Sequence, residues 1–142
     1  MGDRLFQTAQ KRSDVSFFFE PKSVAVVGAT NNPLKFGHYV VLNLKDLGFK
    51  GKVYPVNLKA EEVLGLKAYP RVDLIPDEVD VVAIIVPAPS VPQVVHDCAK
   101  KGVKGVVILS SGFREAGGEG IKFEREIVET AKKAGVRIVG PN

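Results

Sequence analysis

The sequence predicts an α/β domain built on a parallel sheet of about five strands. Short apolar runs alternate with segments whose apolar residues recur at helical spacing, and glycine or proline separates most of them. The runs lack polar alternation, which is typical of strands that are buried on both faces. The chain has 142 residues, of which 45% are hydrophobic and 25% charged, and this suits one globular domain.

The N-terminal segment divides into a tail and a docking turn. Residues 1–16 are polar and are predicted to form a tail, in which residues 4–13 could adopt a frayed helix. The three phenylalanines at 17–19 are too aromatic for an unattached tail, so we expect them to pack on the domain. The folded domain is therefore predicted to cover residues 17–142.

Two strands and a helix are predicted next. Residues 23–28 form the first apolar run and residues 52–57 the second, where Pro55 indicates an edge position or a bulge. A helix that ends at Gly48 is indicated between them by the spacing of Phe36, Val40, Val41, Leu44 and Leu47.

A connection then leads to the most apolar strand. Residues 64–72 carry glycine and proline and predict a linker with a short extended piece at 67–69. Residues 73–76 predict one helical turn. Residues 80–86 predict the third main strand, and Pro87-Ala88-Pro89 ends it.

Two helix–strand pairs complete the domain. Ser90 is the predicted N-cap of a helix that ends at Gly102, and its inward stripe is Val91, Val94, Val95, Cys98 and Ala99. Residues 103–109 predict the fourth strand and residues 136–139 the last. Residues 119–134 predict the last helix, and its inward residues are Phe123, Ile127, Val128, Ala131 and Ala134. This order is typical of a Rossmann-like three-layer fold, in which ligands bind beyond the carboxyl ends of the strands.

The loop after the first strand has the composition of a phosphate cradle. Gly28 allows a sharp turn, small residues let backbone N–H groups approach a ligand, and the next helix directs its positive end to the same place. The same residue types also form plain tight turns, so an ordinary strand-to-helix turn is the alternative. Lys35 adds a full charge. The candidate binding residues are Gly28, Ala29, Thr30, Asn31, Asn32, Pro33, Lys35 and Gly37.

This loop does not fit the dinucleotide fingerprint. That pattern needs a second glycine where this chain has Thr30, and an acidic residue after the second strand to hold the ribose hydroxyls. The second strand instead leads into Asn57-Leu58-Lys59, where a lysine attracts phosphate. Both departures favour a nucleotide with an extra phosphate over NAD, and Asn57 and Lys59 join the candidates.

Two further strand ends are candidate ligand contacts. The third strand ends in an apolar rim that could hold a flat ring, although a rigid turn explains it equally well. The fourth strand ends in two hydroxyls and a glycine, which suit a polar ligand. These residues are Val86, Pro87, Ala88, Ser110, Ser111 and Gly112.

Charge and cysteine content narrow the function classes. Twenty Lys and Arg against sixteen Asp and Glu give a net charge of +4, and the basic residues are scattered without tryptophan, which favours a small anionic ligand over nucleic acid. The single cysteine, Cys98, offers no internal disulfide and no cysteine metal motif. Neither a catalytic residue nor a metal site is evident. Without a signal peptide or a membrane-length apolar run, the chain is expected to be cytoplasmic.

Taken in order, the strand ends resemble the CoA-binding domain of the NDP-forming (ADP-forming) acyl-CoA synthetases, which also opens the succinyl-CoA synthetase alpha subunit. The resemblance covers residues 17–142. It rests on the segments Phe18-Phe19-Glu20-Pro21-Lys22-Ser23-Val24-Ala25-Val26-Val27-Gly28-Ala29-Thr30, Pro33-Leu34-Lys35-Phe36-Gly37, Tyr54-Pro55-Val56-Asn57, Gly65-Leu66-Lys67-Ala68-Tyr69-Pro70, Val86-Pro87-Ala88-Pro89, Ser110-Ser111-Gly112-Phe113 and Gly140-Pro141-Asn142.

The resemblance implies coenzyme A as the ligand. It places residues 28–33 around the CoA phosphates, with Lys35 near that loop. It places Lys59 by the adenosine end and its phosphate. It places residues 86–88 along the cofactor and residues 110–112 nearer the pantetheine arm.

Three functions stay open at this point. In the synthetases, a second domain follows the Gly-Pro-Asn motif and carries a phosphorylated histidine, and neither His38 nor His96 matches that position. A CoA- or acyl-CoA-binding module is therefore preferred, and oligomerisation is an option. The alternative is the N-terminal piece of a ligase that converts acyl-CoA, ADP and phosphate to acid, ATP and CoA, with the remaining domains or subunits as partners. An NAD(P)- or flavin-dependent oxidoreductase or redox sensor is the third.

Overall fold

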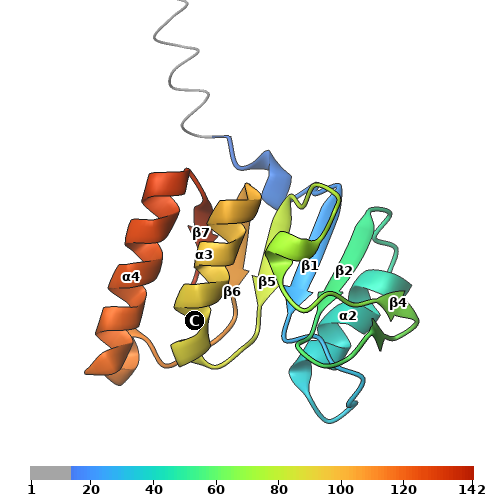
Figure 1. Cartoon of the computed structure of the whole chain (residues 1–142), viewed down its shortest axis with the longest axis horizontal. Coiled ribbons are helices and arrows are strands. Elements are labelled where there is room, and N and C mark those ends of the chain that lie inside the picture. The colour runs from blue at the N-terminus through green and yellow to red at the C-terminus, as the bar shows by residue number, and fades with distance from the viewer. Residues whose placement is uncertain (1–13) are drawn as a thin grey trace, which may run out of the picture.

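Five parallel strands form the central sheet of the computed structural model, which describes residues 14–142. The strand order is β2-β1-β5-β6-β7 (Figure 1). The strands are β1 (Ser23–Val27), β2 (Lys52–Val56), β5 (Val81–Ile84), β6 (Gly105–Ile108) and β7 (Arg137–Val139). The predicted α/β fold with a parallel five-stranded sheet is confirmed. The helix expected at residues 4–13 lies outside the described part of the chain.

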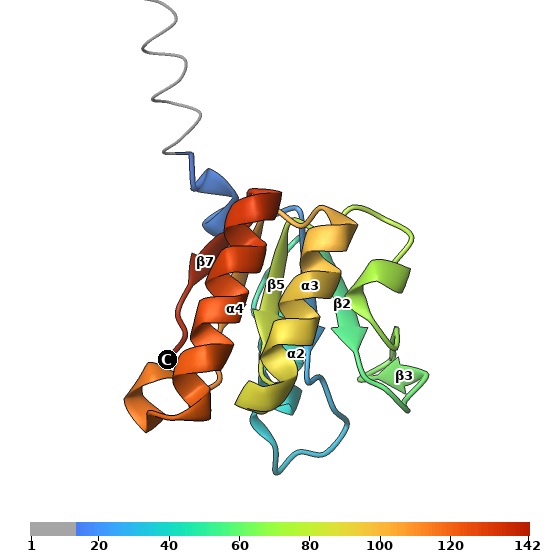
Figure 2. The same ribbon diagram turned by 60° about the vertical axis from the view of Figure 1, so that its left-hand side comes forward.

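Helices cover both faces of the sheet. One face carries α3 (Val91–Lys101) and α4 (Glu119–Ala134), which pack against each other, and the other carries α2 (Phe36–Asp46) (Figures 1 and 2). Successive strand residues point to opposite faces, so β1 serves two cores. Ala25 and Val27 join the core under α3 and α4, and Val24 and Val26 join the core under α2. All five residues of β1 are buried, as its unbroken apolar run predicts.

The N-terminal phenylalanines complete the α2 side of the sheet. Phe17 and Phe18 belong to the short turn η1 (Ser16–Phe18) and pack against the core on that side. Gly105 in β6 makes room for them, because a Cβ atom there would lie 2.4 Å from Phe18 Cζ. The expected docking is confirmed for these two rings, whereas Phe19 points outward and is 81% exposed.

A small hairpin occupies the predicted connection. It pairs β3 (Glu62–Val63) with β4 (Leu66–Lys67), so the extended piece starts one residue earlier than the predicted 67–69. Tyr69 then forms a single bridge to Val56 of β2. Because β2 pairs only with β1 within the main sheet, the edge position indicated by Pro55 is confirmed. The turn predicted at 73–76 is the short helix η2 (Val72–Leu74).

Several side chains depart from their predicted helix faces. Phe36 and Leu47, at the two ends of the α2 stripe, are 60% and 77% exposed because they lie beyond the part of the helix that the sheet covers. Val128 and Ala134 of α4 are also exposed, since only the stripe through Ile127 and Ala131 faces the core. Ser90 occupies the N-cap of α3 but makes no side-chain capping hydrogen bond.

Within residues 14–142, none of the helices combines the length and the apolar character that crossing a bilayer requires. The remaining short helical turns are η3 (Ala88–Ser90) and η4 (Arg114–Ala116). Each follows the carboxyl end of a strand, β5 and β6 respectively. They therefore shape the edge of the sheet at which ligands of this fold class bind.

Candidate functional site

A pocket of about 620 Å³ opens at the carboxyl ends of β1, β2 and β5. This volume is in the range of small-molecule sites. Of the residues predicted to bind a ligand, it is lined by Gly28, Ala29, Thr30, Lys35, Asn57, Lys59, Val86 and Pro87. The structure therefore brings candidate residues from three separate strand ends to one pocket.

The other predicted residues do not line this pocket. Asn31, Asn32 and Pro33 stand on the exposed outer part of the β1–α2 loop. Gly37 lies beneath the loop, where a Cβ atom would stand only 2.0 Å from Gly28 O. Ala88 is buried behind the rim formed by Val86 and Pro87. The lining also excludes three residues of the β6–α4 loop, Ser110, Ser111 and Gly112.

The β1–α2 loop, residues 28–35, turns sharply at its first residue. Gly28 has φ of +99°, a conformation that side chains other than glycine rarely adopt, and its N–H donates to Val56 O at 3.3 Å. Thr30 Oγ1 accepts from Asn32 N at 3.2 Å, and Asn32 Oδ1 accepts from Leu34 N at 2.9 Å. The later half of the loop thus satisfies its own donors.

The earlier half of this loop leaves its donors open. Among residues 14–142, the backbone N–H groups of Ala29, Thr30 and Asn31 have no hydrogen-bond partner. Ala29 and Thr30 line the pocket, and α2 begins immediately after the loop. Adjacent unpaired amides beside a helix N-terminus are the elements of an anion cradle.

Asn57 ties the second strand end to the first. Its Nδ2 donates to Ala29 O at 2.9 Å, and its Oδ1 accepts from the N–H groups of Lys59 and Ala60, both at 2.9 Å. Asn31 makes a similar tie farther out, donating to Glu62 O and accepting from Leu64 N. The predicted asparagines therefore act chiefly as braces that fix the loops around the pocket.

The β6–α4 loop, residues 109–118, is closed by carboxylates of the chain itself. Glu115 Oε1 accepts from Gly112 N at 2.5 Å and from Phe113 N at 3.1 Å. Glu124 Oε2 accepts from Arg114 N at 3.1 Å. The hydrogen bond from Gly112 N–H, with those from the backbone of Glu115 and Phe113, holds the pKa of Glu115 below its usual value. Ser110 Oγ donates to Val86 O and so joins this loop to the rim.

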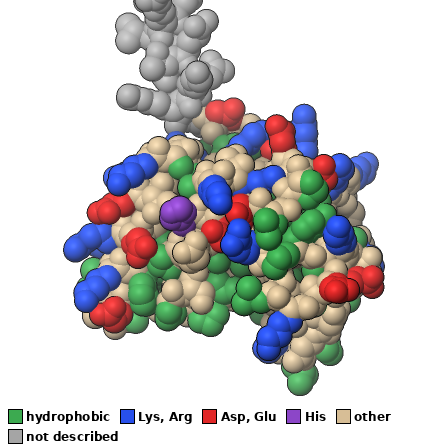
Figure 3. Space-filling view, viewed as in Figure 1, with side chains coloured by type: hydrophobic (Ala, Val, Ile, Leu, Met, Phe, Trp, Pro, Cys, Tyr) green, Lys and Arg blue, Asp and Glu red, His purple; other side chains and the backbone are tan. Residues whose placement is uncertain are grey.

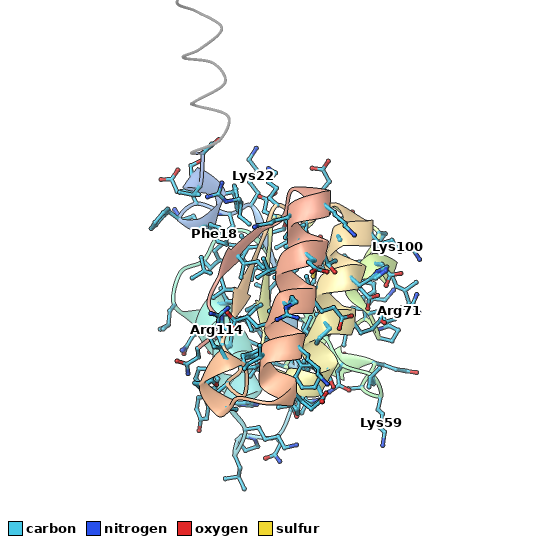
Figure 4. The ribbon with its side chains drawn as sticks, turned by 90° about the vertical axis from the view of Figure 1, so that its left-hand side faces the viewer. Phe18, Lys22, Lys59, Arg71, Lys100 and Arg114 are labelled. Atoms are coloured by element: carbon cyan, nitrogen blue, oxygen red, sulfur yellow. The ribbon has the colours of Figure 1, made fainter. Side chains whose placement is uncertain are left out.

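Sequence reasoning missed the far side of the pocket. Arg71 enters it from the segment before η2, and Gln93, Val94 and Asp97 enter it from α3. No local motif marks these residues, because only the packing of α3 beside η2 brings them to the site. Figure 4 shows Lys59 and Arg71 projecting from the same side of the molecule, with Lys100 beside Arg71. The pocket is thus bordered by the cations Lys35, Lys59 and Arg71 and by one carboxylate, that of Asp97.

The cysteine and the two histidines of the chain do not line this pocket. Cys98 is fully buried, and that burial raises the pKa of its thiol. His38 Nδ1 lies 3.2 Å from Thr30 O behind the cradle, and His96 is exposed on α3. Among residues 14–142, no group of three or more His, Cys, Asp or Glu is arranged to hold a metal ion.

The surface over α3 and α4 mixes charges of both signs. Figure 3 shows Lys and Arg side chains interspersed with Asp and Glu across this face, without a continuous basic stripe. A nucleic-acid interface would need such a stripe. This face therefore does not have the continuous basic surface that is typical of a nucleic-acid interface.

Similar proteins carry the matching domain within longer chains. An ADP-forming acetate–CoA ligase II of Archaeoglobus fulgidus is 54% identical over 129 residues, which are 91% of this chain and 19% of the relative. The alpha subunit of acetate–CoA ligase [ADP-forming] II of Pyrococcus furiosus is 52% identical over 90% of this chain and 28% of its own. The chain thus spans only about a fifth to a quarter of these curated relatives' length.

Solved structures agree with the fold. The dinucleotide-forming acetyl-coenzyme A synthetase 1 of Candidatus Korarchaeum cryptofilum, in its complex with phosphate and ADP, is 47% identical with a TM-score of 0.86, covering 91% of this chain and 27% of that one. A hypothetical protein of Pyrococcus horikoshii is 34% identical with a TM-score of 0.71, covering 87% of this chain and 79% of that one. A sequence model of the CoA binding domain matches residues 22–142, and the chain belongs to this CoA-binding domain family.

Proposed function

We propose that this domain binds coenzyme A or acyl-CoA in the pocket at the carboxyl ends of β1, β2 and β5. The observation that carries the proposal is the open amide donors of Ala29 and Thr30 beside Lys35. A diphosphate fits such a cradle, because backbone N–H groups and a nearby ammonium both bind phosphate oxygens. Lys59, which lines the pocket after β2, offers a second charge for the 3′-phosphate of the nucleotide.

The predicted residues then divide by role. Ala29 and Thr30 offer their backbone N–H groups to the diphosphate, Gly28 provides the turn that exposes them, and Val86 and Pro87 give an apolar wall. Asn57 and Gly37 hold the loop in place, Asn57 from the pocket wall and Gly37 from beneath the loop. Ser110, Ser111 and Gly112 lie outside the pocket, so we assign them to the pantetheine arm, which continues beyond the nucleotide.

A longer protein is the second part of the proposal. Since the relatives contain this domain within ligases three or more times as long, we propose that the chain acts with further domains or subunits in an ADP-forming acyl-CoA synthetase reaction. That reaction converts acyl-CoA, ADP and phosphate to acid, ATP and CoA, and we place it in the cytoplasm. The domain boundary at residue 17 belongs to the same proposal, supported by the packing of Phe17 and Phe18.

Calorimetric titration of the chain with CoA, 3′-dephospho-CoA and NAD tests the binding site. CoA is expected to bind more tightly than dephospho-CoA, and NAD not measurably. Lys59→Ala should weaken CoA about tenfold, since a hydrogen bond to a charged group contributes about 1.5 kcal/mol, and should leave dephospho-CoA unchanged.

Lys22→Ala is the matched control. It removes the same charge at the amino ends of the strands, where Lys22 precedes β1 and Figure 4 places it well away from Lys59. We expect it to leave the affinity for CoA as it is. If both variants lose the same affinity for CoA, Lys59 contributes only through the net charge of the protein. If CoA does not bind the unaltered chain, the proposal is refuted.

A further inference from the structure

The pocket has a second end that the phosphate cradle does not use. Arg71 and Val72 line it on one side, and Gln93, Val94 and Asp97 of α3 line it on the other. Asp97 stands seven residues beyond Ser90, which at 1.5 Å per residue places it roughly 10 Å farther along the helix. These five residues, which we call the base end, come from the η2 segment and from α3, whereas the cradle amides of Ala29 and Thr30 come from the β1–α2 loop.

The cation of the base end is held in place by a carboxylate outside the pocket. Arg71 Nε and Nη2 donate to the two oxygens of Asp73 at 3.0 and 2.9 Å. The hydrogen bond from Arg71 lowers the pKa of Asp73 by more than burial raises it. Lys100 Nζ, 3.5 Å from Asp73 Oδ2, lowers this pKa further, so it stays below its usual value. This two-point contact fixes the plane of the guanidinium, and a fixed guanidinium is a surface on which aromatic rings stack.

On the opposite wall, Gln93 and Asp97 are held by one hydrogen bond between them and keep further polar atoms without a partner in the part of the chain that the structure describes. Gln93 Nε2 donates to Asp97 Oδ1 at 3.0 Å, one helical turn away. This bond fixes which side of the Gln93 amide is the donor. Among residues 14–142, Gln93 Oε1 and Asp97 Oδ2 have no hydrogen-bond partner, and Asp97 forms no salt bridge.

We propose that Gln93 and Asp97 read the edge of the nucleotide base and select adenine. An adenine amino group donates to the unpaired oxygens of this pair, and a ring nitrogen accepts from the second N–H of Gln93, the pairing that glutamine makes with adenine elsewhere. The ring itself lies between Val72 and Val94 beside Arg71. Hypoxanthine would instead bring a carbonyl oxygen against the Asp97 carboxylate. This inference rests on the proposed CoA site and assigns its base specificity.

Adenosine 3′,5′-bisphosphate and inosine 3′,5′-bisphosphate are the probes, because they share both phosphates and differ only at the base edge. Calorimetry on the whole chain should show about tenfold tighter binding of the adenine compound, the difference that an unpaired polar contact makes. Gln93→Ala and Asp97→Asn should bring this ratio toward one. Arg71→Ala should weaken both compounds alike, because stacking does not depend on the base edge.

His96→Ala is the control on the same helix, since His96 is exposed and does not line the pocket. It should keep the ratio of the unaltered chain, and melting temperatures verify that each variant is folded. A ratio near one in the unaltered chain, with CoA still bound, would overturn base reading and leave the CoA site standing. If CoA does not bind at all, both proposals fall together.

Discussion

Two loops at the carboxyl ends of the strands share a glycine framework but differ in whether their backbone N–H groups are hydrogen-bonded within the chain. Each turns at a glycine of positive φ, Gly28 at +99° in the β1–α2 loop and Gly112 at +102° in the β6–α4 loop. Each leads to a helix whose second residue is a glycine pressed against the loop, Gly37 in α2 and Gly120 in α4. Yet the β1–α2 loop leaves backbone donors open to the pocket, whereas the β6–α4 loop has Glu115 and Glu124 bound to its donors.

The difference shows that the glycine framework alone does not make an anion site. In the β6–α4 loop, side-chain carboxylates accept hydrogen bonds from the amides of Gly112, Phe113 and Arg114, and these three amides are therefore not open to a phosphate. A phosphate ligand is therefore expected at the β1–α2 loop. The β6–α4 loop is expected to offer shape and its serine hydroxyls.

The helix glycines give the largest test of this comparison. In Gly37→Ala the new Cβ would meet Gly28 O at 2.0 Å, and in Gly120→Ala it would meet Phe113 O at 2.0 Å. Each change forces a loop to move, so each should cost about 1–3 kcal/mol or more of unfolding free energy. Urea denaturation measures this cost, and CoA titration separates the two loops.

Only Gly37→Ala should abolish CoA binding, because only that change displaces the open amides of Ala29 and Thr30. Gly120→Ala should be similarly destabilised but still bind. If both variants lose CoA equally, the β6–α4 loop contributes more to the site than its closed donors indicate.

Removing Asn57, which ties the end of β2 to the loop after β1, is expected to have the next largest effect on stability and CoA binding. Asn57→Ala removes three hydrogen bonds and leaves Ala29 O without its side-chain donor, which should cost about 1–3 kcal/mol. CoA should bind more weakly, since the β1–α2 loop is no longer tied to β2. Asn43→Ala, an exposed position on α2, is the control and should change neither quantity. An unaltered CoA affinity in Asn57→Ala would contradict the bracing role.

Ser110→Ala is the matching change in the other loop. It removes the hydrogen bond to Val86 O but no contact with the pocket interior. The unfolding free energy should fall by about 1 kcal/mol. Adenosine 3′,5′-bisphosphate should bind as before, and a loss of its affinity would bring Ser110 into the nucleotide site.

Sequence patterns predicted the sheet, and they predicted which residues follow its strands, because both depend on short-range order. The apolar runs at 23–28 and 80–86 set the strands, and the residues after them reach one edge of any parallel sheet. The base end could not be predicted. Arg71 lies far in sequence from Gln93 and Asp97, and it meets them only because η2 packs on α3.

The closed state of the β6–α4 loop was also beyond sequence reasoning. Ser110-Ser111-Gly112 reads like a ligand loop, and Glu115 reads like a solvated charge. Only the three-dimensional turn brings the carboxylate of Glu115 back to Gly112 N and Phe113 N. A carboxylate three residues after a glycine in the loop that follows a strand is a signal that could be sought in other sequences.

Acidification gives the smallest and most local test. Hydrogen bonds from Gly112, Glu115 and Phe113 lower the pKa of Glu115 in the folded chain, so its contribution is present above its ordinary value of 4.5 and is lost as pH falls through the lower folded value. The amide resonance of Gly112, followed by NMR, should therefore shift with a midpoint below 4.5. Glu115→Gln should remove that transition. The amide of Thr30 should show no such transition, because its donor faces the pocket instead of a carboxylate. A midpoint at or above 4.5 for Gly112 would mean that Glu115 does not close the loop, and the contrast between the two loops would be lost.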